Sequence, residues 1–281
     1  MTNDRPADPR SNWAQLSQDD RDAAYDNNSA VKNSPELIAE RNSSSAKARA
    51  TLKSVLDLPY GPRPNNKIDL YPAAERDAPC LVFWHGGYWQ KNSRELFAML
   101  VEGIAAHGWS MAIPGYSLAP DVTLTTIVDE SRAALDWLAA HGPEHGVAGP
   151  VVTSGWSAGG HLVAITLDHP LVTAGLSISG VFDLVPIRDT GLNKALQLTD
   201  DEIEQLSPLR QPMIAKRLDL AYGANELPAL VLDSMNLHER REAAGAPGRL
   251  LPLPGHDHFS ILAELRRPDG ALVKAARALI D

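Results

Sequence analysis

The sequence predicts an α/β protein built on a mostly parallel, doubly wound sheet with helices on both faces. First, apolar strand-like runs alternate with helical patterns from about residue 78 onward, which is the pattern of parallel sheets with crossover helices. Second, residues 80–84 are continuously apolar, as expected of a central strand covered on both faces. Third, residues 155–159 form a glycine-flanked turn between a strand and a helix.

Composition restricts the class of protein. The chain has 281 residues and a net charge of −9, which disfavours nucleic acid or an anionic membrane as a partner. It contains no run of about 18 apolar residues, and its polar N-terminus lacks a signal peptide, so we expect a cytoplasmic protein. The single cysteine, Cys80, excludes an internal disulfide and a cysteine-based zinc site. We expect no metal and no other cofactor.

The first 50 residues are polar and differ from the rest of the chain. We expect no regular structure at the start of residues 1–20, then a helix capped by Ser17. A second helix should begin with Ser34 as its N-cap and Pro35 in its first turn, and run to about Leu52. Because this segment has few large apolar residues, we interpret residues 1–50 as a helical strap or lid over a main α/β domain at residues 51–281.

The main domain divides into strands and helices by hydrophobic period and turn residues. The sequence predicts strands at 54–60, 67–72, 78–84, 109–114, 150–154, 171–180, 217–222 and 249–253. The first two alternate and form an antiparallel hairpin at the sheet edge. Helices are expected at 93–104, 121–141, 161–168, 227–244 and from 259 onward, with an irregular helical insert at 185–213.

The turn Gly-Trp-Ser-Ala-Gly at residues 155–159 has the G-x-S-x-G pattern of a nucleophile elbow. Glycines on either side of the serine let the strand and the helix approach each other, and the strained turn lifts Ser157 Oγ above the sheet edge. The Ala158 N–H and the N-terminus of the following helix would then stabilise an oxyanion at the same place. The motif alone also occurs in structural turns. The interpretation of Ser157 as a nucleophile therefore depends on whether the rest of the sequence supplies an acid, a histidine and an oxyanion loop.

In α/β-hydrolases the catalytic acid and the histidine follow the serine in that order. The loop after the last strand contains two histidines, His256 and His258. We favour His258 as the general base because Phe259 beside it can anchor the loop in the core. His256 is interpreted as a loop residue, and a metal site on the two histidines is disfavoured because a third ligand is lacking.

The catalytic acid should follow the strand at 217–222. Glu226 stands there, where it would hold the tautomer of the imidazole and stabilise the imidazolium. Asp183, after the preceding strand, is the rival, although a capping or turn role is favoured for it. The expected triad is therefore Ser157, His258 and Glu226.

An oxyanion hole needs preorganised backbone N–H groups, which explains two glycines after the strand at 78–84. In His-Gly-Gly-Tyr-Trp at residues 85–89, the N–H groups of Gly87 and Tyr88 are the candidates, together with that of Ala158. His85 is expected to brace this loop.

The segment His-Gly-Gly-Tyr-Trp also resembles the signature of the kynurenine formamidase (arylformamidase) branch of α/β-hydrolases, neighbours of the hormone-sensitive-lipase-like esterases. Similar stretches occur at residues 25–28, 115–120, 179–184 and 257–259, so that the resemblance covers about residues 20–265. Two departures stand out. Trp156 occupies a position that is usually histidine in the family, and the family's Phe-x-x-Gln-Ser is missing after Glu226.

The resemblance implies cleavage of an N-formyl arylamine such as N-formyl-L-kynurenine, with His258 as base and the acid after the penultimate strand. Tyr88 and Trp156 would shape a small acyl pocket, and Trp89 would stack on an aromatic leaving group. A carboxylesterase for short acyl or aryl esters, or an amidase for another aryl amide, uses the same residues and remains an alternative. A non-catalytic receptor is disfavoured because the triad is complete. The sequence leaves open whether the chain forms a homodimer.

Overall fold

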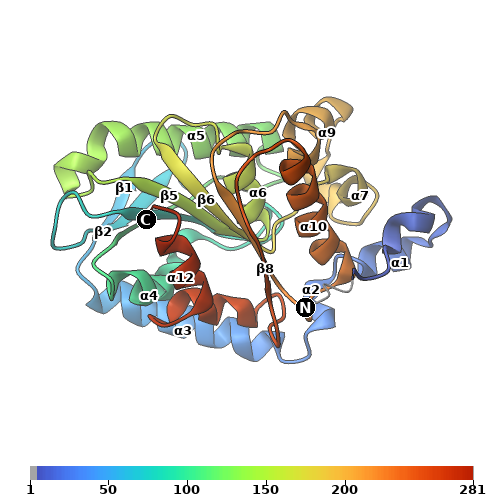
Figure 1. The fold of residues 1–281 in the computed structure, drawn as a ribbon, viewed down its shortest axis with the longest axis horizontal. Coiled ribbons are helices and arrows are strands. Elements are labelled where there is room, and N and C mark those ends of the chain that lie inside the picture. Colours follow the sequence, from blue (N-terminus) through green and yellow to red (C-terminus); the bar gives the residue numbers. More distant parts are fainter. Residues whose placement is uncertain (1–4, 281) are drawn as a thin grey trace.

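The computed structural model of the protein describes residues 5–280 and contains an eight-stranded sheet in the order β1-β2-β4-β3-β5-β6-β7-β8. The two pairs β1/β2 and β2/β4 are antiparallel, and all other neighbouring strands are parallel (Figure 1). This confirms the predicted fold class with its N-terminal hairpin. The strands are β1 (Val55–Pro59), β2 (Lys67–Tyr71), β3 (Cys80–Trp84), β4 (Ser110–Pro114), β5 (Val151–Trp156), β6 (Val172–Ile178), β7 (Leu218–Gly223) and β8 (Leu250–Leu253).

Helices connect the strands and form the N-terminal segment. The α-helices are α1 (Gln18–Ala23), α2 (Asn27–Ala30), α3 (Ser34–Thr51), α4 (Val101–Ala105), α5 (Leu124–His141), α6 (Ala158–Ile165), α7 (Leu184–Arg188), α8 (Asn193–Leu196), α9 (Asp200–Leu206), α10 (Pro228–Ala243), α11 (Ala263–Arg266) and α12 (Ala271–Arg277). The 3-10 helices are η1 (Pro9–Gln15), η2 (Arg94–Leu100), η3 (Gly142–His145), η4 (Pro208–Arg210) and η5 (Ser260–Leu262). Within residues 5–280, no helix combines the length and the apolar character needed to cross a bilayer.

Two apolar layers sandwich the sheet. Helices α5, α6 and α10 cover one face, and α3, α4 and α12 cover the other (Figure 1). Strand β3 shows why both layers are needed, since Val82 packs into the first layer and Phe83 into the second. Successive side chains of a strand point to opposite faces. A strand that is buried on both sides must therefore be apolar at every position, as β3 is.

The N-terminal segment differs from its sequence prediction in two details. Residues 9–15 form the 3-10 helix η1, so the expectation that they lack regular structure is wrong, whereas residues 1–4 lie outside the described part of the chain. Ser17 caps α1 as predicted, because its side chain accepts from the Asp20 N–H. Asn33, rather than Ser34, is the N-cap of α3, while the Ser34 hydroxyl donates to a carbonyl within the segment.

The N-terminal strap, as we name residues 1–50, is tied to the main body by polar contacts within its described part. Arg10 Nη1 lies 2.6 Å from the fully buried Asp233 Oδ1 on α10. Asp22 Oδ1 accepts from the Gly191 N–H at 2.7 Å. Helix α3 lies along η2. These contacts hold the strap against the main body of the protein.

Candidate active site

Ser157 occupies the turn between β5 and α6 with φ 59° and ψ −119°, a conformation that L-residues rarely adopt. Its N–H donates to Ile178 O at 2.8 Å, which fixes the turn against β6. A Cβ at Gly155 would lie 2.3 Å from Gly159 O, and one at Gly159 would lie 2.0 Å from Trp84 O. Both glycines are therefore required by close backbone approach. This geometry is that of the predicted elbow.

His258, in the loop after β8, faces Glu226 from the loop after β7. Their Nδ1 and Oε2 atoms are 2.9 Å apart, and the side chains are 4% and 0% exposed. The other carboxylate oxygen of Glu226 accepts from Ser179 Oγ and from the Gly223 N–H, both at 2.6 Å. With the Nδ1 hydrogen directed at the carboxylate, Nε2 of the imidazole is left as the proton acceptor.

The rival residues have other partners. His256 lies with Nε2 3.6 Å from the Glu264 carboxylate, away from the cavity described below. Asp183 caps α7 by accepting from the Val185 N–H at 3.1 Å. Between residues 5 and 280, no three His, Cys, Asp or Glu side chains are grouped so that they could hold a metal ion. The structure thus brings His258 to Glu226 and leaves His256 and Asp183 in local roles.

Trp156 joins the elbow to the histidine loop. Its indole Nε1 donates to His258 O at 2.7 Å, and the two ring centroids are 4.8 Å apart. A hydrogen bond and a ring contact therefore hold the loop of His258 next to the turn that contains Ser157. Ser157 Oγ has no hydrogen-bond partner among the residues that the structure describes, so its hydroxyl is free to turn toward the imidazole or into the cavity.

The loop after β3 supplies the other predicted N–H donors. Gly87 has φ +123°, and a Cβ there would lie 2.4 Å from a backbone oxygen of the same loop; Tyr88 also has a positive φ of 51°. The Asn92 side chain supports the turn by donating to Gly86 O at 2.9 Å. In the described part of the chain, the N–H groups of Gly87, Tyr88 and Ala158 donate to no acceptor. They remain available to a developing oxyanion.

His85 braces this loop from below. Its ring stacks on Tyr116 with centroids 4.2 Å apart, and the Tyr116 hydroxyl donates to His85 O at 2.7 Å. Burial lowers the pKa of His85 to about 4, because desolvation disfavours the charged imidazolium. A neutral, stacked imidazole fits the supporting role that the sequence predicted.

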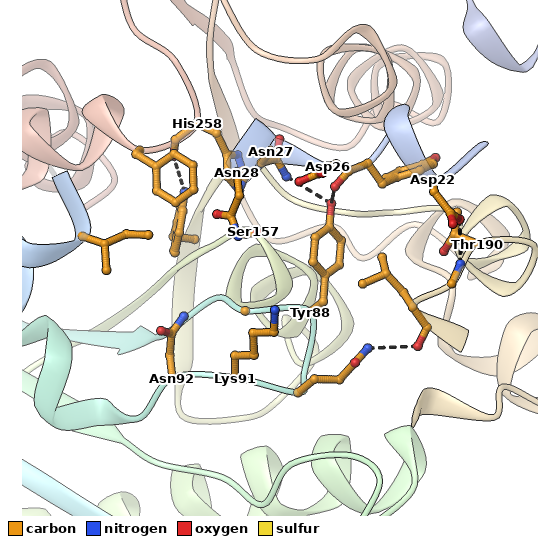
Figure 2. A pocket seen from close by; sticks show the side chains of 18 of the residues that line it. Asp22, Asp26, Asn27, Asn28, Tyr88, Lys91, Asn92, Ser157, Thr190 and His258 are labelled. Carbon is orange, nitrogen blue, oxygen red and sulfur yellow. Dashed lines mark hydrogen bonds between the residues drawn. The ribbon is translucent and has the colours of Figure 1, made fainter. Parts of the chain in front are cut away.

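The Tyr88 side chain connects the loop to the N-terminal strap (Figure 2). Its hydroxyl donates to Tyr25 O at 2.8 Å and accepts from Asn27 Nδ2 at 3.1 Å. Burial raises the pKa of Tyr88, so the hydroxyl stays protonated and keeps donating. The strap and the oxyanion loop therefore form one wall.

The cavity enclosed by these elements has a volume of about 350 Å³, near the small end of ligand sites. Ser157 and His258 face it from the main domain, with Asn92 and Lys91 opposite Asn28 (Figure 2). The strap supplies a large share of the lining, including Tyr25, Asn27, Asn28 and Arg41.

Trp89 does not reach this cavity, which contradicts the predicted substrate contact. Its side chain is completely buried, and its indole meets His161 edge-to-face at 5.0 Å. The sequence interpretation in turn missed Asn92, Ser179 and Asn27. Asn92 and Ser179 both adopt positive φ, but a single sequence carries no signal for that.

Comparison with known proteins places these features among hydrolases. The BD-FAE family model matches residues 68–168. The chain is 25% identical to a kynurenine formamidase of Danio rerio, with 96% of this chain and 99% of that protein covered. It is 30% identical to an esterase of Gibberella moniliformis, over 40% of this chain and 36% of that protein.

Solved structures agree with this assignment. A Silicibacter sp. TM1040 protein that carries a provisional thioesterase name superposes with a TM-score of 0.81 at 28% identity, covering 91% of this chain and 98% of that one. Esterase B of Lactobacillus rhamnosis shares the fold with a TM-score of 0.71 at 17% identity, covering 89% and 96%. The chain therefore has the α/β-hydrolase fold and is similar to kynurenine formamidases and esterases.

Proposed function

We propose that the protein is a serine hydrolase that removes a small acyl group, formyl above all, from an aryl amide such as N-formyl-L-kynurenine. The observation that carries the proposal is the buried His258–Glu226 pair beside the strained Ser157, with His258 and Ser157 lining one cavity. Similarity to kynurenine formamidases over nearly the whole chain supports the choice of substrate.

Ser157 Oγ attacks the carbonyl carbon while His258 Nε2 accepts its proton. Glu226 keeps Nδ1 protonated and stabilises the imidazolium that forms. The same proton then passes to the amine nitrogen as the C–N bond breaks, which leaves a formyl ester on Ser157. A water molecule, deprotonated by His258, hydrolyses that ester, so formate leaves and the serine is regenerated.

The tetrahedral intermediate has a negative oxygen, for which the N–H groups of Gly87, Tyr88 and Ala158 are the proposed donors. Their freedom from other hydrogen bonds within residues 5–280 supports that role. Removal of one such donor typically weakens transition-state binding by about 3 kcal/mol. Tyr88 and Trp156 line the cavity beside Ser157 and would leave room for a small acyl group only.

A carboxylesterase acting on short acyl or aryl esters is the second candidate, since it would use the same residues, and esterases are among the relatives. An amidase for another aryl amide is a third reading, supported by Trp156 in place of the usual histidine.

Steady-state kinetics on N-formyl-L-kynurenine and p-nitrophenyl acetate test the choice. We expect kcat/KM to be at least about a hundredfold higher for the formamide, a difference of roughly 2.7 kcal/mol in transition-state binding. Comparable kcat/KM values, or a higher value for the ester, would show that the protein is an esterase and not a formamidase.

A further inference from the structure

Arg41 is an unusual lining residue of the cavity. It lies on α3 and is only 5% exposed. Its guanidinium donates to two neutral amides, with Nε and Nη2 directed at Asn42 Oδ1 and Nη2 also at Asn92 Oδ1, over 2.9–3.3 Å. Its Cζ lies 4.6 Å from the centroid of the Phe97 ring. Among the described residues, no carboxylate pairs with Arg41.

The other two buried arginines of the described chain have carboxylate or backbone carbonyl partners. Arg94 pairs with Asp57 and Asp69. Arg241 uses both terminal nitrogens on three backbone carbonyl oxygens. Arg41, by contrast, has only two amide side chains as acceptors within residues 5–280, and its Nη1 donates to neither of them. A buried charge that lacks both a counter-ion and a full set of acceptors is destabilising, so its retention at a cavity points to an external partner.

The surrounding charges favour an anion near this arginine. Burial without a counter-charge lowers the pKa of Arg41 to about 10, so the group still carries its charge near neutral pH. Lys91 lines the same cavity, and Asn92, which bonds Arg41, lies beside it (Figure 2). The acidic lining residues Asp22 and Asp26 both accept hydrogen bonds from protein N–H groups.

We propose that Arg41 is a specificity-determining residue that binds a carboxylate on the leaving group of the substrate. The inference rests on the proposed function, because a formyl group is too small to carry the charge and the anion must then belong to the arylamine side. The guanidinium suits this ligand, since its Nη1 can donate to a carboxylate while Nε and Nη2 stay fixed by Asn42 and Asn92. The substrate class becomes an aryl amide with a carboxylate side chain.

The experiment compares substrates that differ only in that charge. One pair is N-formyl-L-kynurenine and its α-carboxamide; a second is 3-(4-acetoxyphenyl)propanoate and its carboxamide, which tests the anion site independently of formamide cleavage. We expect the native protein to favour each acid over its amide by about tenfold or more in kcat/KM, mainly through KM, as for a charge-assisted hydrogen bond.

Asn42→Asp is the decisive variant. Asn42 does not line the cavity, but a carboxylate there would neutralise Arg41 from behind. We expect the preference for each acid over its amide to fall several-fold. Ser43→Asp adds the same charge at an exposed position of α3 and should leave the preference intact. Arg41→Gln should abolish the preference.

If Asn42→Asp and Arg41→Gln slow acid and amide by the same factor, or the native protein shows no preference, Arg41 only supports Asn92 and the proposal is wrong. If the formamides are inert while the ester pair shows the charge effect, the anion site stands and the formamidase fails. If the formamides are turned over but neither substrate pair shows the charge effect, the formamidase stands and the anion site fails.

Discussion

At the scale of single residues, Ser157 has a strained backbone and a side-chain hydroxyl without a hydrogen-bond partner in the described chain. Its backbone is held at φ 59° by the Ile178 carbonyl and by two glycines, while its hydroxyl has no partner in the described chain. Strain of this kind persists only where the surrounding structure fixes it, and it collects at functional sites. The hydroxyl can therefore be removed without disturbing a hydrogen bond.

Ser157→Ala should abolish turnover and leave the fold intact. We expect kcat to fall by at least about 10⁴-fold on p-nitrophenyl acetate and on the formamide, since the nucleophile is lost. Circular dichroism and the melting temperature should match those of the native protein. Activity above a small residual level would show that another residue attacks the carbonyl.

The two histidines after β8 provide a matched pair of variants. His258 is buried against Glu226, whereas the side chain of His256 is 26% exposed and faces Glu264. His258→Ala should lower kcat by roughly 10²–10⁴-fold, the range expected for a general base. His256→Ala should change it by less than about threefold, as a surface substitution does. Equal losses in the two variants would undo the assignment of the base.

At the scale of elements, local pattern was sufficient for the sheet and for the elbow. The continuous apolar run of β3 follows from its burial on both faces. In β2 the polar Asp69 is also buried, because its carboxylate pairs with Arg49 and Arg94. The elbow followed from the glycines at 155 and 159, whose close contacts are with the adjacent helix and strand. The constraint on Gly155 acts within a few residues, at Gly159 O, whereas the constraint on Gly159 comes from Trp84 O on the neighbouring strand.

The remaining features depend on contacts between distant segments. Arg10 meets Asp233 on α10, and Trp89 turns away from the cavity to pack on His161 in α6. No period or turn signal encodes such pairs. For the same reason the contribution of α3 to the cavity, through Arg41, could not be predicted from a helix whose sequence is polar on all sides.

The contact of the strap with the oxyanion loop depends on the Tyr88 hydroxyl, and Tyr88→Phe tests it. The substitution leaves Asn27 Nδ2 and Tyr25 O without this partner, at a cost of about 1–3 kcal/mol in unfolding free energy. We expect kcat/KM to fall about tenfold or more because the loop loses its support. An unchanged kcat/KM beside a lowered melting temperature would confine the hydroxyl to a structural role.

At the scale of the whole molecule, the cavity is assembled from residues 22 to 259. The order of the sheet places the loops after β3, β5, β7 and β8 at one edge, because parallel strands end on the same side. The strap then closes that edge from outside. Folding of the entire chain is therefore needed before Ser157, His258 and the strap residues line one cavity.

Acid sensitivity of the whole fold should follow from two buried imidazoles. Burial lowers the pKa of both His85 and His161 from 6.5 to about 4, so each is neutral in the folded state and protonates first in the unfolded state. Each histidine contributes about 3 kcal/mol to the unfolding free energy. This contribution is complete above pH 6.5 and is lost as the pH falls to about 4. Asp233 acts in the opposite direction, because burial raises its pKa to about 6.

The net effect should be a loss of roughly 3 kcal/mol in unfolding free energy between about pH 7 and about pH 4.5. Urea denaturation at the two pH values measures it. In His161→Gln, which removes one of the two imidazoles, the difference between the two pH values should shrink by about half or more, because Asp233 still opposes the remaining histidine. A native protein whose unfolding free energy is equal at both pH values would mean that these histidines are protonated, or exposed to water, in the folded state.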